Sequence, residues 1–179
     1  GAGLEFSQYR GYEPGDEPRR IDWKLYARSD RFFVREAERD SPLAVWIVLD
    51  ASASMTQEDQ GRPGWSRLDA ARTLAACIAE VALRQGDRVG LVALRDDALA
   101  FVPTAGGARQ RDRLSFELQR IAAGGGVPDE ARLRPIWERI AADDLVVVIG
   151  DFLDGAVPAL GTRLAGARRE VLAIQVLTV

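Results

Sequence analysis

Two continuous apolar runs dominate the pattern of the chain. Residues 43–49 read Leu-Ala-Val-Trp-Ile-Val-Leu, and residues 145–149 read Leu-Val-Val-Val-Ile. Runs of this length without alternation are typical of strands buried on both faces, as in parallel sheets. Asp50 directly follows the first run, and Asp151 follows the second after Gly150. The pattern therefore predicts two central strands that each end in an acidic side chain.

A helix with clear boundary signals follows the first strand. Ser66 is expected to be its N-cap, with Asp69 as the capping-box partner, and Gly86 ends it. Apolar positions at helical spacing predict its buried stripe, which consists of Leu68, Ala71, Leu74, Ala75, Ile78 and Ala82. Cys77 is also expected on the apolar face of this helix, buried by packing.

The remaining segments complete an alternation of strands and helices. Residues 88–94 and 98–102 are expected to be strands joined by three residues, a link that permits a hairpin but no crossover. The second of them should therefore be antiparallel and near an edge. Helices are expected over residues 109–123, 128–142 and 157–165, and a last strand over residues 171–176. This alternation predicts an α/β fold with a doubly wound, mostly parallel sheet and one antiparallel edge strand.

Residues 1–42 lack this alternation and are rich in charged and aromatic side chains. Short strands and loops are expected here, with an extended piece near residues 31–36. This N-terminal extension should pack on the α/β domain, which is expected over residues 43–179. The charged block around Trp23 suits a docking surface or a structural role, and we favour the structural role with Trp23 largely buried.

Composition excludes several classes of function. The net charge is −3 with acids and bases interspersed, which argues against a nucleic-acid-binding surface. The chain has no histidine, which excludes a Ser-His-Asp triad and histidine-ligated zinc, and its single cysteine excludes an intrachain disulfide. No apolar run approaches the roughly 20 residues of a membrane span. These features predict a cytoplasmic protein.

The segment Asp50-Ala51-Ser52-Ala53-Ser54 is the most specific chemical signal in the chain. Oxygen side chains spaced two residues apart can turn toward one point in an extended loop. One carboxylate and two hydroxyls are hard ligands that suit Mg²⁺ or Mn²⁺, and Asp151 would approach from the next strand end, directly or through water. The alternative is that these side chains only cap the following turn. We predict a metal site formed by Asp50, Ser52, Ser54 and Asp151.

This arrangement resembles the metal-ion-dependent adhesion site of von Willebrand factor A-type domains, and the resemblance covers residue 43 to about residue 176. The N-terminal block is similar to the signature of the family called domain of unknown function 58. The similar pieces are Glu5-Phe6, Tyr9-Arg10, Gly15-Asp16, Arg20-Ile21-Asp22-Trp23 and Ala27-Arg28. Members of that family carry a von Willebrand A-like domain, and their genes often neighbour MoxR-type AAA ATPases. The resemblance implies a metal-dependent protein-binding module that acts as an adaptor to such an ATPase.

The chain departs from the adhesion-site pattern in two places. The family adds a threonine ligand from a glycine-containing loop, but the loop over residues 124–129 has no threonine, and Thr104 lies nearer the predicted hairpin. The isolated domain is therefore expected to bind magnesium weakly. The chain also ends after the last strand, where the fold usually adds another strand and helix. Either the domain is truncated there or the N-terminal extension covers that edge.

Two other functions stay open at this point. A strand that ends in aspartate also begins the site of haloacid-dehalogenase-like, Mg²⁺-dependent phosphohydrolases, but these need a second aspartate at the position of Ser52. The third possibility is a structural domain whose metal site has degenerated. We predict a binding module that is not an enzyme.

Overall fold

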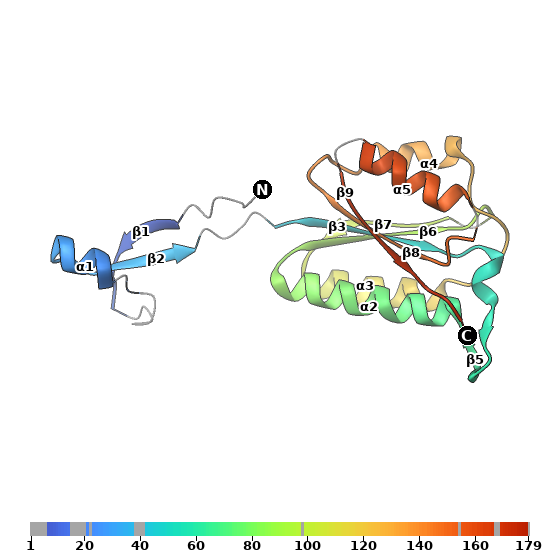
Figure 1. Ribbon diagram of the computed structural model, residues 1–179, viewed down its shortest axis with the longest axis horizontal. Helices are drawn as coiled ribbons and strands as arrows, with labels where there is room; N and C mark the ends of the chain where they lie inside the picture. Colours follow the sequence, from blue (N-terminus) through green and yellow to red (C-terminus); the bar gives the residue numbers. More distant parts are fainter. Residues whose placement is uncertain are drawn as a thin grey trace. The chain divides into compact units, whose positions relative to one another are not determined.

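The computed structural model describes residues 7–14, 21, 23–37, 42–97, 99–153, 155–166 and 169–178. The chain divides into two compact units, Gly1–Ser41 and Pro42–Val179 (Figure 1). The second unit contains the predicted sheet. That the first unit packs on the second stays a prediction.

A five-stranded sheet forms the centre of the second unit. Its strands are β3 (Ala44–Asp50), β6 (Arg88–Leu94), β7 (Ala100–Ala105), β8 (Leu145–Gly150) and β9 (Glu170–Gln175). They lie in the order β7-β6-β3-β8-β9, and every neighbouring pair is parallel except β6 and β7. The predicted fold class is therefore confirmed, including the antiparallel strand at an edge.

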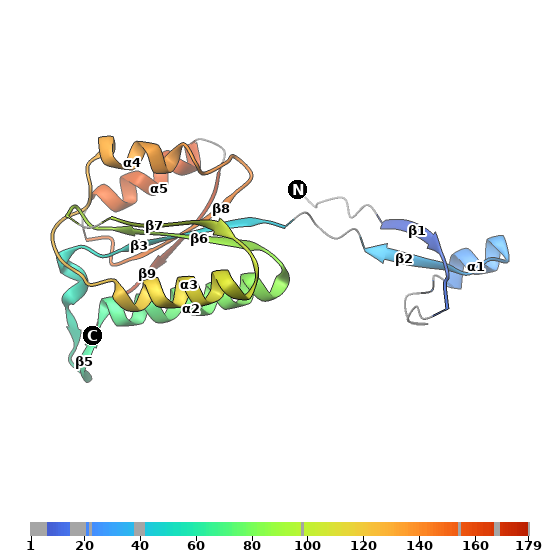
Figure 2. The same cartoon turned by 180° about the vertical axis from the view of Figure 1, so that it is seen from behind.

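Helices cover both faces of this sheet (Figures 1 and 2). One face carries α2 (Arg67–Gln85) and α3 (Gly107–Arg120), and the other carries α4 (Glu130–Trp137) and α5 (Ala156–Gly166). Because both faces are covered, the central strands need apolar side chains on both sides, which explains their continuous apolar runs.

The central strand β3 is buried along its whole length and connects the two core layers. Val45, Ile47 and Leu49 belong to the core on the α2 side. Trp46 and Val48 belong to the core on the α4 side. This alternation fixes the register of β3, because a shift by one residue would exchange the two sets of side chains.

The structure confirms the predicted boundaries of helix α2. Ser66 and Asp69 form the full capping box, and Gly86 ends the helix in a left-handed conformation with φ of 92°. The residues buried along it are Leu68, Ala71, Ala75, Ala79 and Ala82. The small side chains of the alanines allow the helix to lie close to the sheet.

Leu74, which was predicted in the buried stripe, is 38% exposed, and Cys77, which was predicted on the apolar face, is exposed as well. At about 100° per residue, Cys77 lies roughly 200° around the helix from the buried Ala75 and so faces away from the sheet. The prediction that Cys77 is buried is wrong for this reason.

The segment that joins β3 to α2 is more ordered than the sequence indicates. It begins with a 3-10 turn, η2 (Ala53–Thr56), and continues as a two-stranded antiparallel ribbon. The ribbon consists of β4 (Glu58–Asp59) and β5 (Arg62–Ser66), where a loop was expected. Helix α4 is shorter than the predicted residues 128–142; it contains Pro135 and ends at Trp137.

The first unit contains an antiparallel pair of strands, β1 (Ser7–Gly11) and β2 (Phe33–Ala37). β2 lies at the extended piece predicted near residues 31–36. Between the strands lies the helix α1 (Trp23–Ser29), which the sequence did not predict.

Trp23 is 59% exposed, so the prediction that it is largely buried is wrong. Its ring makes edge contacts with Tyr26 and Phe32, at centroid distances of 6.1 Å and 6.2 Å, and these two rings stack on each other. Trp23 is the first residue of α1, and these contacts with its neighbours leave more than half of its surface exposed.

Candidate functional site

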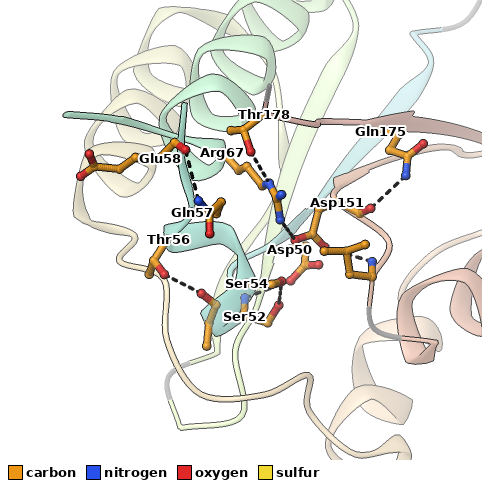
Figure 3. Close-up of polar contacts among 12 residues, drawn as sticks. Asp50, Ser52, Ser54, Thr56, Gln57, Glu58, Arg67, Asp151, Gln175 and Thr178 are labelled. Carbon is orange, nitrogen blue, oxygen red and sulfur yellow. Dashed lines mark hydrogen bonds and ion pairs between the residues drawn. The ribbon is translucent and has the colours of Figure 1, made fainter. Parts of the chain in front are cut away.

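Asp50 and Asp151 lie beside each other at the carboxyl edge of the sheet (Figure 3). β3 and β8 are parallel neighbours with Leu49 opposite Ile149, so both strands end at the same place. Both aspartates are fully buried. A Cβ atom on Gly150 would lie 2.7 Å from the Cβ of Asp50, so only glycine fits between them. The prediction that the two carboxylates share one edge is confirmed.

The loop after β3 turns two hydroxyl groups toward each other. The backbone N–H of Ser52 donates to Asp50 Oδ1 at 2.9 Å, which bends the chain back over the strand end. Ser52 Oγ and Ser54 Oγ then lie 3.3 Å apart. Met55 is completely buried and holds the loop against the core.

The glycine-rich loop at residues 124–126 supports this arrangement with its backbone. Gly124 N–H donates to the carbonyl of Ala51 at 2.9 Å, and Ala53 N–H donates to the carbonyl of Gly125 at 3.0 Å. Gly125 has φ of +61°, and a Cβ on it would lie 2.1 Å from Asp96 Oδ1. The loop therefore contacts the serine segment at the place where a threonine side chain was expected from the family, but it does so through backbone groups.

Thr104 lies far from this site. It belongs to β7, next to Ala105, which pairs with Val89 near the start of β6. Its methyl group packs over Gly90, 2.9 Å from where a Cβ would be. Thr104 therefore belongs to the opposite edge of the sheet and does not replace the missing ligand.

Arg67 is a site residue that the sequence does not single out. Its Nη1 lies 3.1 Å from Asp151 Oδ2, and its Nε donates to Thr178 Oγ1 at 3.2 Å (Figure 3). The other carboxylate oxygen of Asp151 accepts the N–H of Leu153 at 3.1 Å. Both oxygens of Asp151 are thus engaged within the chain.

One signal could have identified Arg67 from the sequence. It is the first residue of α2, where the helix dipole favours acidic side chains, and the first turn holds Asp69 as expected. An arginine directly after the N-cap therefore indicates a partner elsewhere, and that partner is Asp151.

The oxygen atoms around Asp50 fit a small divalent cation. Ligands at right angles on Mg²⁺, each about 2.0–2.1 Å from the ion, lie about 3 Å apart, close to the 3.3 Å between the two serine hydroxyls. Across the described part of the chain, no group of three or more acidic or cysteine side chains could hold a metal. The candidate ligands are therefore the mixed set of Asp50, Ser52 and Ser54, and Asp151 fits best through water because its oxygens are already engaged.

A family profile described as "Protein of unknown function DUF58" matches residues 8–178. The chain is also 33% identical over 184 residues to the uncharacterized protein Rv1480 of Mycobacterium tuberculosis. That alignment covers 99% of this chain and 56% of the relative, so the chain spans about half the length of the curated protein it matches.

Two solved structures share the fold at low sequence identity. One is an aerotolerance-related membrane protein from Bacteroides fragilis, with a TM-score of 0.55, 20% identity and coverage of 75% of this chain and 67% of that chain. The other is the conserved hypothetical protein BatB from Bacteroides thetaiotaomicron, with a TM-score of 0.55, 21% identity and coverage of 74% and 66%. Among the described residues of this chain, no helix is both long and apolar enough to cross a membrane.

Proposed function

The chain belongs to the DUF58 family, and we propose that its carboxyl edge is a metal-ion-dependent docking site for an acidic side chain of a partner protein. The von Willebrand A-like fold itself suggests a protein-interaction module. The family has no established function, so the proposal depends on the residues of the site.

The observation that carries the proposal is the convergence of Ser52 Oγ and Ser54 Oγ, 3.3 Å apart, beside the buried Asp50. In this proposal Asp50 and the two hydroxyls hold the cation, and Asp151 contributes through water. A bound Mg²⁺ or Mn²⁺ would supply residual positive charge and an open position for a carboxylate, because two of its three direct protein ligands are neutral.

The partner we propose is a MoxR-type AAA ATPase that the domain meets in the cytoplasm. This rests on the family resemblance alone, which is an associational argument. The chemistry of the site narrows the contact to an aspartate or glutamate of the partner, because such a side chain completes the oxygen shell and balances the charge.

A structural role is the second candidate, and the pairing of Arg67 with Asp151 favours it. Arg67 compensates one of the two buried carboxylates without any metal, so a stable edge does not require an ion. A phosphohydrolase has less support, because Ser52 occupies the position of the second aspartate that such an enzyme needs.

A binding experiment with a MoxR-type ATPase encoded by a neighbouring gene tests the proposal. We expect the chain to bind the immobilised ATPase in magnesium, to lose most binding in chelator, and to lose it in Asp50→Ala. Asp112→Ala is the matched control, because Asp112 is an exposed acid on α3. Equal binding in magnesium and chelator would contradict the metal-dependent site. Turnover of an aryl phosphate would instead support the enzyme, and stability unaffected by magnesium would support the structural role.

A further inference from the structure

We propose that Arg67 is an internal competitor for the metal, so that Arg67 and a divalent cation are alternative partners of Asp151. The inference rests on the metal site proposed above and concerns its regulation. Arg67 would set the cation concentration at which that site fills.

Arg67 is firmly held where it lies. Its backbone N–H donates to the carbonyl of Gln57 at 2.9 Å, and its side chain is only 14% exposed. The guanidinium reaches Asp151 Oδ2 through Nη1 and Thr178 Oγ1 through Nε. The contact therefore joins the start of α2, the end of β8 and the segment after β9.

The charges of the site make Arg67 and the metal compete. Asp50 and Asp151 are both fully buried at neighbouring strand ends, so their negative charges repel each other unless a cation lies close. Arg67 supplies one such positive charge to Asp151. A divalent cation held by Asp50 would lie near this guanidinium, and the two positive charges would repel each other.

Arg67 also occupies one of the two oxygens of Asp151. Oδ1 accepts the N–H of Leu153 and Oδ2 accepts the guanidinium of Arg67. A cation, or a water bound to it, that approaches Oδ2 therefore has to share this oxygen with Arg67. This gives the isolated domain a reason for weak metal binding that is independent of the missing threonine.

The test compares Arg67→Gln with the unmodified chain by calorimetric titration of magnesium. Gln keeps much of the side-chain length but removes the charge, so we expect magnesium binding about ten- to a hundredfold tighter, the equivalent of one lost hydrogen bond between charged groups. Arg67→Lys keeps the charge and should bind nearly as the unmodified chain does. In an Asp151→Asn background, Arg67→Gln should no longer change the affinity.

Arg169→Gln is the matched control. Arg169 is also partly buried and directly precedes β9. It donates to the carbonyls of Trp137 and Ile140 and does not contact Asp151. It should leave magnesium affinity unchanged. Thermal unfolding adds a second readout: magnesium should raise the Tm of Arg67→Gln more than that of the unmodified chain or of Arg169→Gln.

The possible results separate the inference from the proposed function. Unchanged or weaker magnesium binding by Arg67→Gln, with binding by the unmodified chain abolished in Asp50→Ala, overturns the competition and leaves the metal site intact. Absence of magnesium binding in every variant overturns both. If Arg67→Gln does not fold, an NMR titration of the unmodified chain replaces it. The competition predicts that the resonance of Arg67 Nε–H shifts as magnesium is added. An unshifted resonance at magnesium saturation overturns the competition.

Discussion

The two ends of the parallel strands bury polar side chains in different ways. Near the amino end of β6, the buried Gln110 donates from Nε2 to the carbonyls of Val89, at 2.7 Å, and Pro103, at 2.9 Å. At the carboxyl ends, Asp50 and Asp151 are also buried, but they are acids and not amides.

The difference shows what distinguishes a structural polar residue from a candidate ligand. Gln110 is neutral, and both of its bonds close gaps between backbone segments. At the other end, two hydroxyls lie 3.3 Å apart beside a buried carboxylate. Burial of a polar side chain is common to both ends, so the proposed metal site rests on the convergence of the oxygens and not on burial.

Substitutions of Asp50 at the carboxyl ends and of Gln110 at the amino end should have the largest effects, and the two effects should differ in kind. Asp50→Ala and Asp50→Asn should abolish magnesium binding, because each removes the carboxylate that binds the cation directly in the proposed site. Gln110→Ala should leave magnesium binding intact but lower the free energy of unfolding by about 1–3 kcal/mol, since the buried carbonyl of Val89 and the carbonyl of Pro103 lose their donor. Calorimetry and urea unfolding measure the two effects. Magnesium binding that survives Asp50→Asn would show that the oxygens around Asp50 are not the site.

Met55 tests whether the serine loop depends on the core beneath it. Met55→Ala should lower the free energy of unfolding by about 2–5 kcal/mol, because it removes a completely buried side chain. The same variant should weaken magnesium binding, since the loop that holds both hydroxyls loses its anchor. Urea unfolding checks the first effect and titration the second. A change in stability below about 0.5 kcal/mol, the range of ordinary surface substitutions, would mean that the loop is held in another way.

A threonine at position 126 should raise the affinity of the proposed site for magnesium. A Cβ on Gly126 would meet Asp96 Oδ2 at 3.3 Å, a contact that a small shift relieves, whereas Gly125 leaves no space. Gly126→Thr should tighten magnesium binding by about one to two decades if its hydroxyl adds a ligand, by analogy with a bond to a charged group. Gly126→Val has the same shape without the hydroxyl and is the control. Equal affinities of the two variants would show that the hydroxyl does not reach the cation.

Removal of the capping side chain Asp69 from α2 should change the free energy of unfolding by the smallest amount, and the change should depend on pH. The backbone N–H of Ser66, followed by the Ser66 hydroxyl and Arg72, lowers the pKa of Asp69 below its ordinary value. A lowered pKa in the folded state means that Asp69 stabilises the fold above its unfolded pKa of about 3.9 and loses this contribution as pH falls through the folded value. Asp69→Ala should cost about 1 kcal/mol at pH 7, as for other lost caps.

The pH series checks this sign. The difference in unfolding free energy between Asp69→Ala and the unmodified chain should shrink below about pH 4, where Asp69 becomes protonated. A difference that stays constant down to pH 2 would show that the charge of Asp69 does not contribute.

Most of the sheet could be predicted because its signals are local and strong. A strand buried on both faces must be apolar throughout, so β3 and β8 are visible as continuous runs, and the capping box marks the start of α2. Parallel strands end at one edge, which is why the proximity of Asp50 and Asp151 followed from sequence alone.

The missed elements and contacts have different causes. The ribbon β4–β5 and the helix α1 are short, and their segments mix polar and aromatic side chains without a periodicity that distinguishes them from loops. Arg67 was missed because its partners, Asp151 and Thr178, lie 84 and 111 residues further along the chain. The place of Arg67 at the helix start indicates that it has a partner elsewhere, but a pairing over such a separation leaves no local pattern that identifies the partner.

That separation also sets the order in which the site is assembled during synthesis. Translation adds residues at about 5–20 per second, so Thr178 is joined to the chain several seconds after Arg67. The serine loop is complete well before the strand that supplies Asp151 exists. Newly made chains therefore pass through a stage in which Asp50 and the two hydroxyls are present before Arg67 has its partners, and the contacts of Arg67 are complete only after the segment with Thr178 has left the ribosome.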